Sequence, residues 1–300
     1  MKDWTRSVSR GLCALLLGAG SAGFTACGSA EGRAGGVGEE SARSTAEGSL
    51  LVLAASDLRV AFEEVGAAFE QRSGTGVRFA FGSSGNLAAQ IRHGAPADLF
   101  FSADEGFLDP LVESGRIDPA SRHLYAVGRL ALVAPPGAVP PRSPEALAES
   151  KYELVAIANP EHAPYGAMAR KALRAAKVWE EVSGRLVLGE DVAQTYQLVR
   201  TGNADAGIVA LPLILGAPGP ERPYTIIDDR LHPPLRQAAG VLSSSSRPDA
   251  AHAFLDFVLS EDGGAILLRH GFESPHAATE RVEFNAEEGP RTGTVASGSH

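Results

Sequence analysis

The sequence predicts an α/β fold with parallel-rich sheets, helices on both faces, and two lobes that face a ligand cleft. Short apolar segments alternate with segments of helical periodicity across residues 49–275. Four times, an apolar segment runs into a polar turn that opens a helix. A proline-rich segment at 135–144 separates two blocks, each with two such turns. Ligands of such sheets bind beyond the carboxyl ends of the strands, so the four turns are expected to line the cleft.

The first block opens with the apolar segment 50–54, which is expected to be a strand. Ser56 and Asp57 follow in the cap positions of a helix whose apolar face repeats as far as Phe69. The alternating segment 77–81 predicts the second strand. Further strands are expected at 98–101 and 130–134, with a helix over 107–112.

The second block repeats the order of strand, polar turn and helix start. A strand at 154–158 leads through Asn159 and Pro160 to a helix that opens near Tyr165. A strand at 186–188 is followed in the same way by a helix that opens at Glu190, Asp191 and Val192. Two more strands are expected at 206–210 and 238–242, and the last helical segments close at Phe272.

The chain is organised around the turn Gly82-Ser83-Ser84-Gly85, which joins the strand at 77–81 to the next helix. Its glycines keep the backbone unobstructed, and its serines place hydroxyls beside N–H groups that the first helical turn leaves unpaired. With the positive end of the helix dipole, these groups form a seat for an anion. A plain helix cap also explains such a turn, but the repetition of the device at three further turns favours a ligand site.

Composition excludes several functions. Of 300 residues, 44% are hydrophobic and 21% are charged, which is typical of a globular protein. The net charge of −9 argues against nucleic-acid binding. The eight histidines show no metal-ligand spacing, so no site for a free metal cation is expected. The central turn lacks the Gly-x-Ser-x-Gly pattern of a nucleophile, and no histidine motif stands out as its base, so an enzyme is not expected. No cofactor is expected either.

Both ends of the chain are expected to lie outside the fold. Residues 1–26 predict a secretory signal, because a basic start precedes an apolar run too short to span a membrane. Cys27 follows Phe24-Thr25-Ala26, which is similar to a bacterial lipobox, and is expected to carry a lipid anchor. The other cysteine, Cys13, lies inside the signal, so the mature chain has no internal disulfide. Residues 27–48 predict a flexible tether and residues 276–300 a disordered tail.

Five motifs recur in a specific order and spacing: residues 54–58, 82–85, 94–104, 159–166 and 202–210. Together they resemble the periplasmic molybdate-binding proteins of ABC importers, over about residues 50–272. The resemblance implies a two-lobed periplasmic-binding-protein fold of type II, in which the chain crosses between the lobes twice. The substrate-binding domain would span 49–275, with lobe 1 at about 49–130 and 237–275 and lobe 2 at about 131–236.

The resemblance also implies the ligand, molybdate or tungstate, held as a dehydrated tetrahedral oxyanion by neutral hydrogen-bond donors. Ser56 and Ser84 match hydroxyl ligands of the family, and Tyr165 and Val192 match positions that donate a backbone N–H. The Tyr165 hydroxyl is expected to add a further donor. Asp57 is expected to turn its N–H to the anion and to cap the helix with its carboxylate, because that charge would repel a dianion.

The resemblance implies an extracytoplasmic, membrane-anchored lipoprotein, in the periplasm or at the cell surface, that acts as a monomer. It would deliver molybdate or tungstate to an ABC permease and its ATPase. Two alternatives stay open: another anion, such as sulfate, phosphate or an organic acid, and a non-transport sensor of the same fold. The donor chemistry agrees with a fully deprotonated tetrahedral dianion, which accepts many hydrogen bonds and donates none. A set of carboxylates would instead indicate a metal cation.

Overall fold

The computed structural model describes residues 48–217 and 222–275. The predicted signal, Cys27, the tether up to residue 47 and the predicted tail at 276–300 lie outside the described residues. In the ranges that are described, no helix is both long and apolar enough to cross a membrane.

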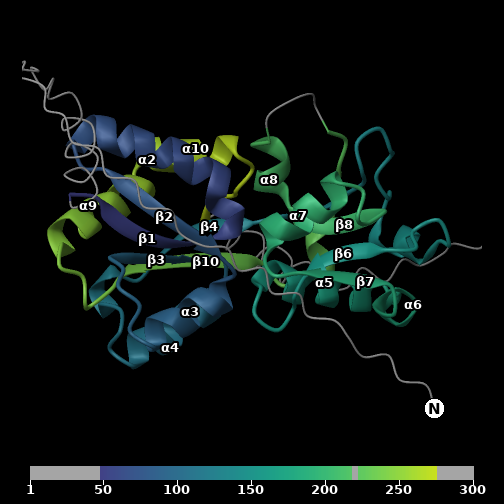
Figure 1. The fold of residues 1–300 in the computed structure, drawn as a ribbon, viewed down its shortest axis with the longest axis horizontal. Coiled ribbons are helices and arrows are strands. Elements are labelled where there is room, and N and C mark those ends of the chain that lie inside the picture. The colour runs from purple at the N-terminus through teal and green to yellow at the C-terminus, as the bar shows by residue number, and fades with distance from the viewer. Residues whose placement is uncertain (1–47, 218–221, 276–300) are drawn as a thin grey trace, which may run out of the picture. The chain divides into compact units, whose positions relative to one another are not determined.

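Lobe 1 is built on a five-stranded sheet (Figure 1) that comprises β1 (Leu50–Ala55), β2 (Val77–Gly82), β3 (Leu99–Ser102), β4 (His123–Gly128) and β10 (Leu235–Val241). The strand order is β2-β1-β3-β10-β4. β1 pairs in parallel with β2 and β3, whereas β10 pairs antiparallel with β3 and β4. The sheet thus places the ends of β1, β2 and β3 side by side at one edge.

The helices of lobe 1 are η1 (Ser56–Leu58), α2 (Arg59–Ser73), α3 (Ser84–Arg92), α4 (Glu105–Glu113), α9 (Pro248–Leu259) and α10 (Glu261–Arg269). In Figure 1, α2 and α10 lie on one face of the sheet and α3 and α4 on the other. Along β1, Val52 joins the core that includes Phe62 of α2, and Leu53 joins the core that includes Leu87 of α3. Successive side chains of a strand point to opposite faces, so one strand serves both cores.

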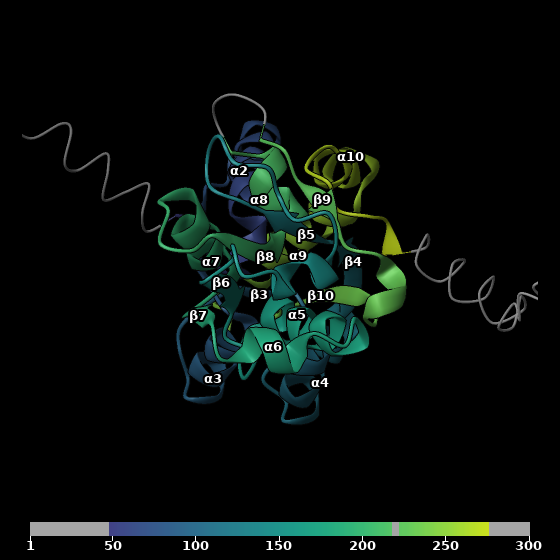
Figure 2. The same ribbon diagram turned by 90° about the vertical axis from the view of Figure 1, so that its right-hand side faces the viewer.

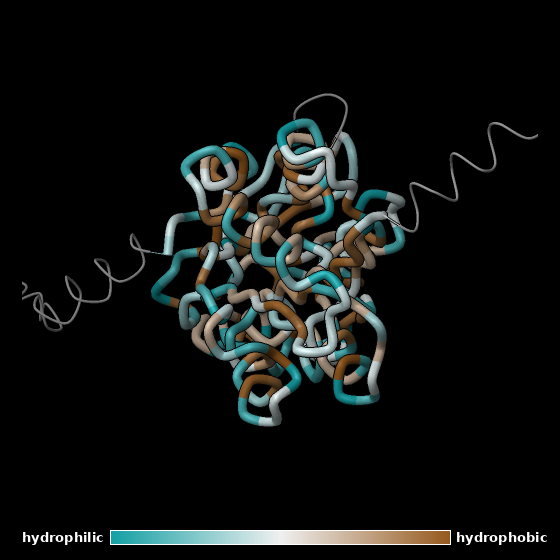
Figure 3. Tube along the Cα trace, turned by 90° about the vertical axis from the view of Figure 1, so that its left-hand side faces the viewer, coloured by the Kyte–Doolittle hydropathy of each residue, from teal (hydrophilic) through white to brown (hydrophobic). Residues whose placement is uncertain are grey.

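The hydropathy pattern of lobe 1 follows this layering. In Figure 3, hydrophobic segments gather on the inner sides of the helices, and hydrophilic segments lie at the outer turns. Phe62 is fully buried and packs edge-on against Phe101, with ring centroids 4.9 Å apart. Aromatic pairs of this kind add to the stabilisation from burial. Together with the fully buried Leu58, Phe62 fixes the start of α2 at the end of β1.

Lobe 2 is built on β5 (Leu130–Val133), β6 (Val155–Ala158), β7 (Leu186–Gly189), β8 (Ala206–Ala210) and β9 (Thr225–Ile226), in the order β7-β6-β8-β5-β9. β6 pairs in parallel with β7 and β8, and β5 pairs antiparallel with β8 and β9. Its helices, shown face-on in Figure 2, are α5 (Pro164–Ala175), α6 (Trp179–Ser183), α7 (Val192–Arg200) and α8 (Leu211–Leu215). Further short 3-10 helices lie in the connections: η2 (Pro119–Ser121) before β4 of lobe 1, η3 (Pro144–Ala148) between β5 and β6, and η4 (Asp229–Leu231) between β9 and β10.

The observed architecture refines the parallel-rich sheets expected from the alternation of strands and helices. In each sheet, two of the four strand pairings are antiparallel. These pairings belong to β10 and β5, the strands by which the chain arrives from the other lobe. A helical crossover enforces parallel pairing only between the strands that it joins, so an arriving strand is free to run the other way.

The chain passes from lobe 1 to lobe 2 between β4 and β5, and it returns between β9 and β10. The first connection is a single residue, Arg129. Its carbonyl accepts a hydrogen bond from the N–H of Leu211 at 3.0 Å, and its side chain forms an ion pair with Glu273 at 3.3 Å. The polypeptide therefore crosses between the lobes twice, as a type II binding-protein fold requires.

Candidate functional site

One small cavity brings together the five residues predicted for the site. Its volume is about 10 Å³, enough for roughly one water molecule and less than a tetrahedral oxyanion needs. Four helix starts meet there, two from each lobe. The lining comprises Ala55, Ser56, Asp57, Gly82, Ser83, Ser84, Ala103, Ala163, Pro164, Tyr165 and Val192.

Lobe 1 contributes two serine hydroxyls. In the register of the sheet, Ala55 at the end of β1 is paired with Gly82 at the end of β2, so the turns that carry Ser56 and Ser84 are neighbours. Ser84 Oγ accepts a hydrogen bond from the N–H of Ala103 at 3.0 Å. Ser56 Oγ accepts one at 3.3 Å from the N–H of Ala193, which lies in lobe 2. Within the described part of the chain neither hydroxyl proton has an acceptor, so both hydroxyls retain a donor for a ligand.

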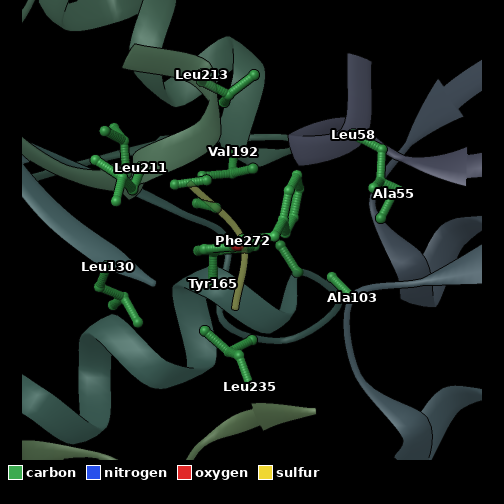
Figure 4. Packing of buried hydrophobic residues seen from close by; sticks show 14 of the residues in the cluster. Ala55, Leu58, Ala103, Leu130, Tyr165, Val192, Leu211, Leu213, Leu235 and Phe272 are labelled. Carbon is green, nitrogen blue, oxygen red and sulfur yellow. The ribbon is translucent and has the colours of Figure 1, made fainter. Parts of the chain in front are cut away.

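Lobe 2 contributes backbone N–H groups at the starts of α7 and α5. Asp191 caps α7, because its Oδ1 accepts from the N–H groups of Ala193 and Gln194 at 2.9 Å each. Val192 is the first residue of that helix, so its N–H has no acceptor within the helix. Tyr165 is the second residue of α5 and is in the same position. Figure 4 shows Tyr165 and Val192 in one cluster with Ala55 and Ala103 of lobe 1.

The close approach of α5 to the sheet depends on Gly166. A Cβ at this position would overlap the carbonyl group of Ala158, the last residue of β6. Any other residue would therefore push the start of α5 away from the strand end. Because Tyr165 precedes Gly166, the position of its N–H in the cavity depends on this glycine.

The carboxylate of Asp57 corrects one expectation from the sequence. It was expected to cap the helix, but its Oδ2 instead accepts a hydrogen bond from Gln237 Nε2 at 2.7 Å. The side chain of Asp57 is 1% exposed, and its Oδ1 has no hydrogen-bond partner among the described residues. The physical reason is that β10 places the side-chain amide of Gln237 within hydrogen-bond distance of the carboxylate.

Asp57 belongs to a buried polar network. Gln237 Nε2 also donates to the Tyr165 hydroxyl at 3.3 Å, and the Tyr125 hydroxyl donates to Gln237 Oε1 at 2.7 Å. Burial raises the pKa of Asp57 to about 6, and the donors around it, chiefly Gln237 and Tyr165, lower it by less. Burial, together with the Asp57 charge, raises the pKa of both Tyr125 and Tyr165 well above the usual range, so both tyrosines are neutral.

Three residues that take part in the site, Ala103, Gln237 and Tyr125, were not predicted from the sequence. Ala103 follows β3, and its N–H donates to Ser84 Oγ. Gln237 donates to the Asp57 carboxylate, and the Tyr125 hydroxyl donates to Gln237. The sequence offers one signal for Gln237, which is a polar residue directly before the apolar run 238–242. The predicted strand at 238–242 began too late to include it.

The rim of the cavity, which we define as Ser83, Gly85, Asn86, His162 and Glu190, is closed by contacts between the lobes. Ser83 Oγ lies 2.9 Å from His162 Nδ1, and the N–H of Gly85 donates to the carbonyl of His162 at 2.9 Å. Asn86 Nδ2 donates to Glu190 Oε1 at 2.6 Å. Ser83 therefore faces the rim, whereas Ser84 faces the interior.

The chemistry of the interior is that of hydrogen-bond donation. Within residues 48–217 and 222–275, no lysine or arginine lines the cavity, and the one carboxylate in its lining is that of Asp57. Among the described residues, no group of three or more histidine, cysteine or acidic side chains is placed to hold a metal ion. Hydroxyls and helix N-termini from two lobes, joined by a double crossing, define a solute-binding protein that encloses a small polar ligand.

Comparison with known proteins assigns the chain to a family of solute-binding proteins. The model of the bacterial extracellular solute-binding proteins matches residues 50–273, and the chain belongs to that family. The chain is 35% identical to the molybdate-binding protein ModA of Rhodobacter capsulatus, over 76% of this chain and 89% of that protein. It is 32% identical to YvgL of Bacillus subtilis, provisionally described as an ABC transporter substrate-binding lipoprotein, over 74% and 85% of the two chains.

Solved structures agree with this assignment. The periplasmic molybdate-binding protein of Azotobacter vinelandii is similar with a TM-score of 0.71 and 31% identity, over 75% of this chain and 99% of that chain. These findings confirm the family and the two-lobed fold predicted from the motifs. The family consists of binding proteins, which agrees with the prediction that the chain is not an enzyme.

Proposed function

We propose that the protein captures molybdate or tungstate outside the cytoplasm and delivers it to an ABC importer. The observation that carries the proposal is the convergence of two donor hydroxyls, Ser56 and Ser84, and two helix-start N–H groups, Tyr165 and Val192, on one cavity. Each of these groups is neutral and can donate. The similarity to proteins named for molybdate binding supports the choice of ligand.

Within each lobe the donors come from helix starts anchored in one sheet, so the distances between donors of the same lobe are set by the backbone, and closure of the lobes brings the two sets together around a ligand. A smaller anion cannot reach all of them at hydrogen-bond distance, and selection by size follows. Phosphate carries a proton near neutral pH, and that proton needs an acceptor. The ligand is therefore expected to be the larger, fully deprotonated oxyanion.

Titration calorimetry of the mature chain with molybdate, tungstate, sulfate and phosphate tests this proposal. Tight binding of molybdate and tungstate with weak binding of sulfate and phosphate is the expected result. Equal affinity for sulfate and molybdate would contradict the selection by size.

One observation favours a second candidate, a monoprotonated oxyanion such as hydrogen phosphate. The unpartnered Oδ1 of Asp57 is an acceptor in the cavity, and it could receive the proton of such a ligand. The same titrations decide between the two, because this candidate requires phosphate to bind more tightly than molybdate.

A sensor of the same fold would differ in its partners, so a permease and an ATPase gene beside the coding sequence would favour transport.

The membrane anchor is a further part of the proposal. Cys27 lies outside the described residues, and the support comes from its lipobox-like context and from the lipoprotein relative YvgL. A Cys27→Ser variant is expected to leave the membrane fraction, as measured by fractionation and immunoblotting. Unchanged membrane association would contradict the anchor without affecting the ligand assignment.

A further inference from the structure

The starting point is a buried carboxylate inside a cavity that is suited to an anion. Asp57 is 1% exposed and lines the cavity together with Ser56 and Ser84. Its Oδ2 is bound by Gln237 Nε2 at 2.7 Å, while Oδ1 has no partner among the described residues. A buried acceptor without a donor is rare in folded proteins and calls for an explanation.

The carboxylate is held in place. The Tyr125 hydroxyl donates to Gln237 Oε1 at 2.7 Å, which leaves the amide NH₂ of Gln237 to face Asp57. Tyr125 lies on β4, Gln237 on β10 and Asp57 on η1, so three elements fix the side chain. Because Asp57 cannot turn out of the cavity, an anion that enters must share the space with it.

Among the described residues, no lysine or arginine is paired with the Asp57 carboxylate. The groups that face it are the amide of Gln237 from β10, the hydroxyl of Tyr165 from α5 and the backbone N–H groups of Asp57 and Leu58, and the Asp57 charge also acts on Tyr125 of β4. Both tyrosines are neutral, because burial raises their pKa values well above the usual range. Arg59, two residues along the chain, is exposed and lies over the ring of Phe81 at 4.7 Å. Two negative charges in contact here would repel each other without compensation.

Resting on the function proposed above, we infer that Asp57 binds the oxyanion as a neutral carboxylic acid, with a proton on Oδ1 that it donates to the ligand. The site with its carboxylate ionised, one proton from solvent and the dianion combine into a complex in which the carboxylic acid bonds an oxyanion oxygen. No other bond forms or breaks. The unpartnered oxygen thereby becomes a donor, in keeping with the two serine hydroxyls beside it.

The free site is suited to this exchange. Burial raises the pKa of Asp57 to about 6, so the carboxylate is largely ionised at pH 7.5, and taking up the proton there lowers the affinity about thirtyfold relative to a site that is already neutral. If only the neutral form binds, affinity should fall about tenfold for each pH unit above about 6. Hydrogen phosphate would instead bring its own proton and would bind without uptake from solvent.

The test is calorimetry of the purified mature chain with sodium molybdate at pH 7.5, in two buffers that differ in ionisation enthalpy. Wild type is expected to take up close to one proton per molybdate. Asp57→Asn, which has a neutral donor at the same place, is expected to take up none and to bind equally well from pH 6 to pH 8.

Two matched variants serve as controls. Asp104→Asn changes a half-buried carboxylate whose pKa is also raised by burial, but Asp104 caps α4 outside the cavity. His162→Gln removes the imidazole of the rim. Both variants are expected to keep the proton uptake of wild type.

Molybdate binding to wild type without proton uptake would overturn this inference and leave the proposed function intact. Uptake that persists in Asp57→Asn would overturn it too, because the proton would then belong to another group. If neither molybdate nor tungstate binds at any pH, the proposed function fails, and the inference fails with it.

Discussion

The interior of the cavity and its rim differ in how their polar groups are satisfied. At the rim, polar groups of the two lobes are partners of each other, as in the contacts of Ser83 with His162 and of Asn86 with Glu190. In the interior, the hydroxyl protons of Ser56 and Ser84 and the Oδ1 of Asp57 are unpaired within the described residues. The protein's own groups therefore satisfy the rim, whereas the interior reaches full hydrogen bonding only around a ligand.

The interior and the rim therefore contribute differently to ligand binding and to closure of the lobes. Exposed pairs such as Asn86 with Glu190 contribute little, because water competes for both partners. Buried donors cost more when unpaired and give more when a charged ligand satisfies them. Changes to the interior should therefore alter which ligand binds and how tightly, and side-chain changes at the rim should alter closure only slightly. The rim has one exception, where backbone meets backbone at Gly85.

Gly85→Ala is expected to have the largest effect. A Cβ at Gly85 would lie 2.7 Å from the carbonyl oxygen of His162 and 2.9 Å from its Cα, so the lobes could not approach as they do here. We expect a loss of molybdate affinity of at least about a hundredfold, since donors of lobe 2 no longer reach the ligand. Calorimetry measures the loss, and an unchanged thermal midpoint of the free protein serves as the control for folding. Wild-type affinity would show that closure tolerates a displaced rim.

Ser84→Ala and Ser56→Ala come next. Each removes one hydroxyl donor to an anion, and a charge-assisted hydrogen bond of this kind contributes about 1.5–3 kcal/mol, roughly ten- to a hundredfold in affinity. Ser83→Ala is the matched control, because Ser83 faces His162 at the rim and should cost less than about threefold. Equal losses at Ser83 and Ser84 would remove the distinction between rim and interior.

Asp57→Asn is expected to stabilise the free protein in a pH-dependent manner. The pKa of Asp57 is about 6 in the folded state against 3.8 as a reference, so the folded state binds more protons and its stability falls as pH rises from about 4 to 6. Asn removes this loss, and the free energy of unfolding at pH 8 should rise by about 1–3 kcal/mol, with no gain at pH 4. Denaturant titrations at both pH values measure it.

Asn86→Ala should have a small effect, of the same order as that of Ser83→Ala. It removes the hydrogen bond from Asn86 to Glu190, which is exposed at the surface between the lobes. Such contacts contribute about 0.2–1 kcal/mol, so molybdate affinity should fall no more than about fivefold. A loss as large as that of Ser84→Ala would mean that the rim shares in ligand selection.

The sequence anticipated much of this fold because its strongest signals are local. Apolar runs such as 50–54 and the polar turns after them set the helix starts, and those turns carry Ser56, Ser84, Tyr165 and Val192. What it did not predict depends on contacts between distant segments. The strand β4 was not anticipated, because its pairing partner β10 lies more than a hundred residues away along the chain. The surroundings of Asp57 escaped prediction for the same reason, since Gln237 reaches it only through that pairing.

The single-residue junction at Arg129 has a mechanical consequence. The Arg129 carbonyl is bound by Leu211 and its side chain is paired with Glu273, so we expect little freedom of rotation at this junction. The second connection, before β10, then fixes the axis about which the lobes rotate. The lobes should then swing along one coordinate, as the halves of a clamshell do. Residues 28–300 contain no cysteine, so in a chain that begins after Cys27 a dye pair can be attached through one introduced cysteine on each lobe. Energy transfer in single molecules should resolve two discrete distances, and the ligand should change how often each is visited rather than where they lie.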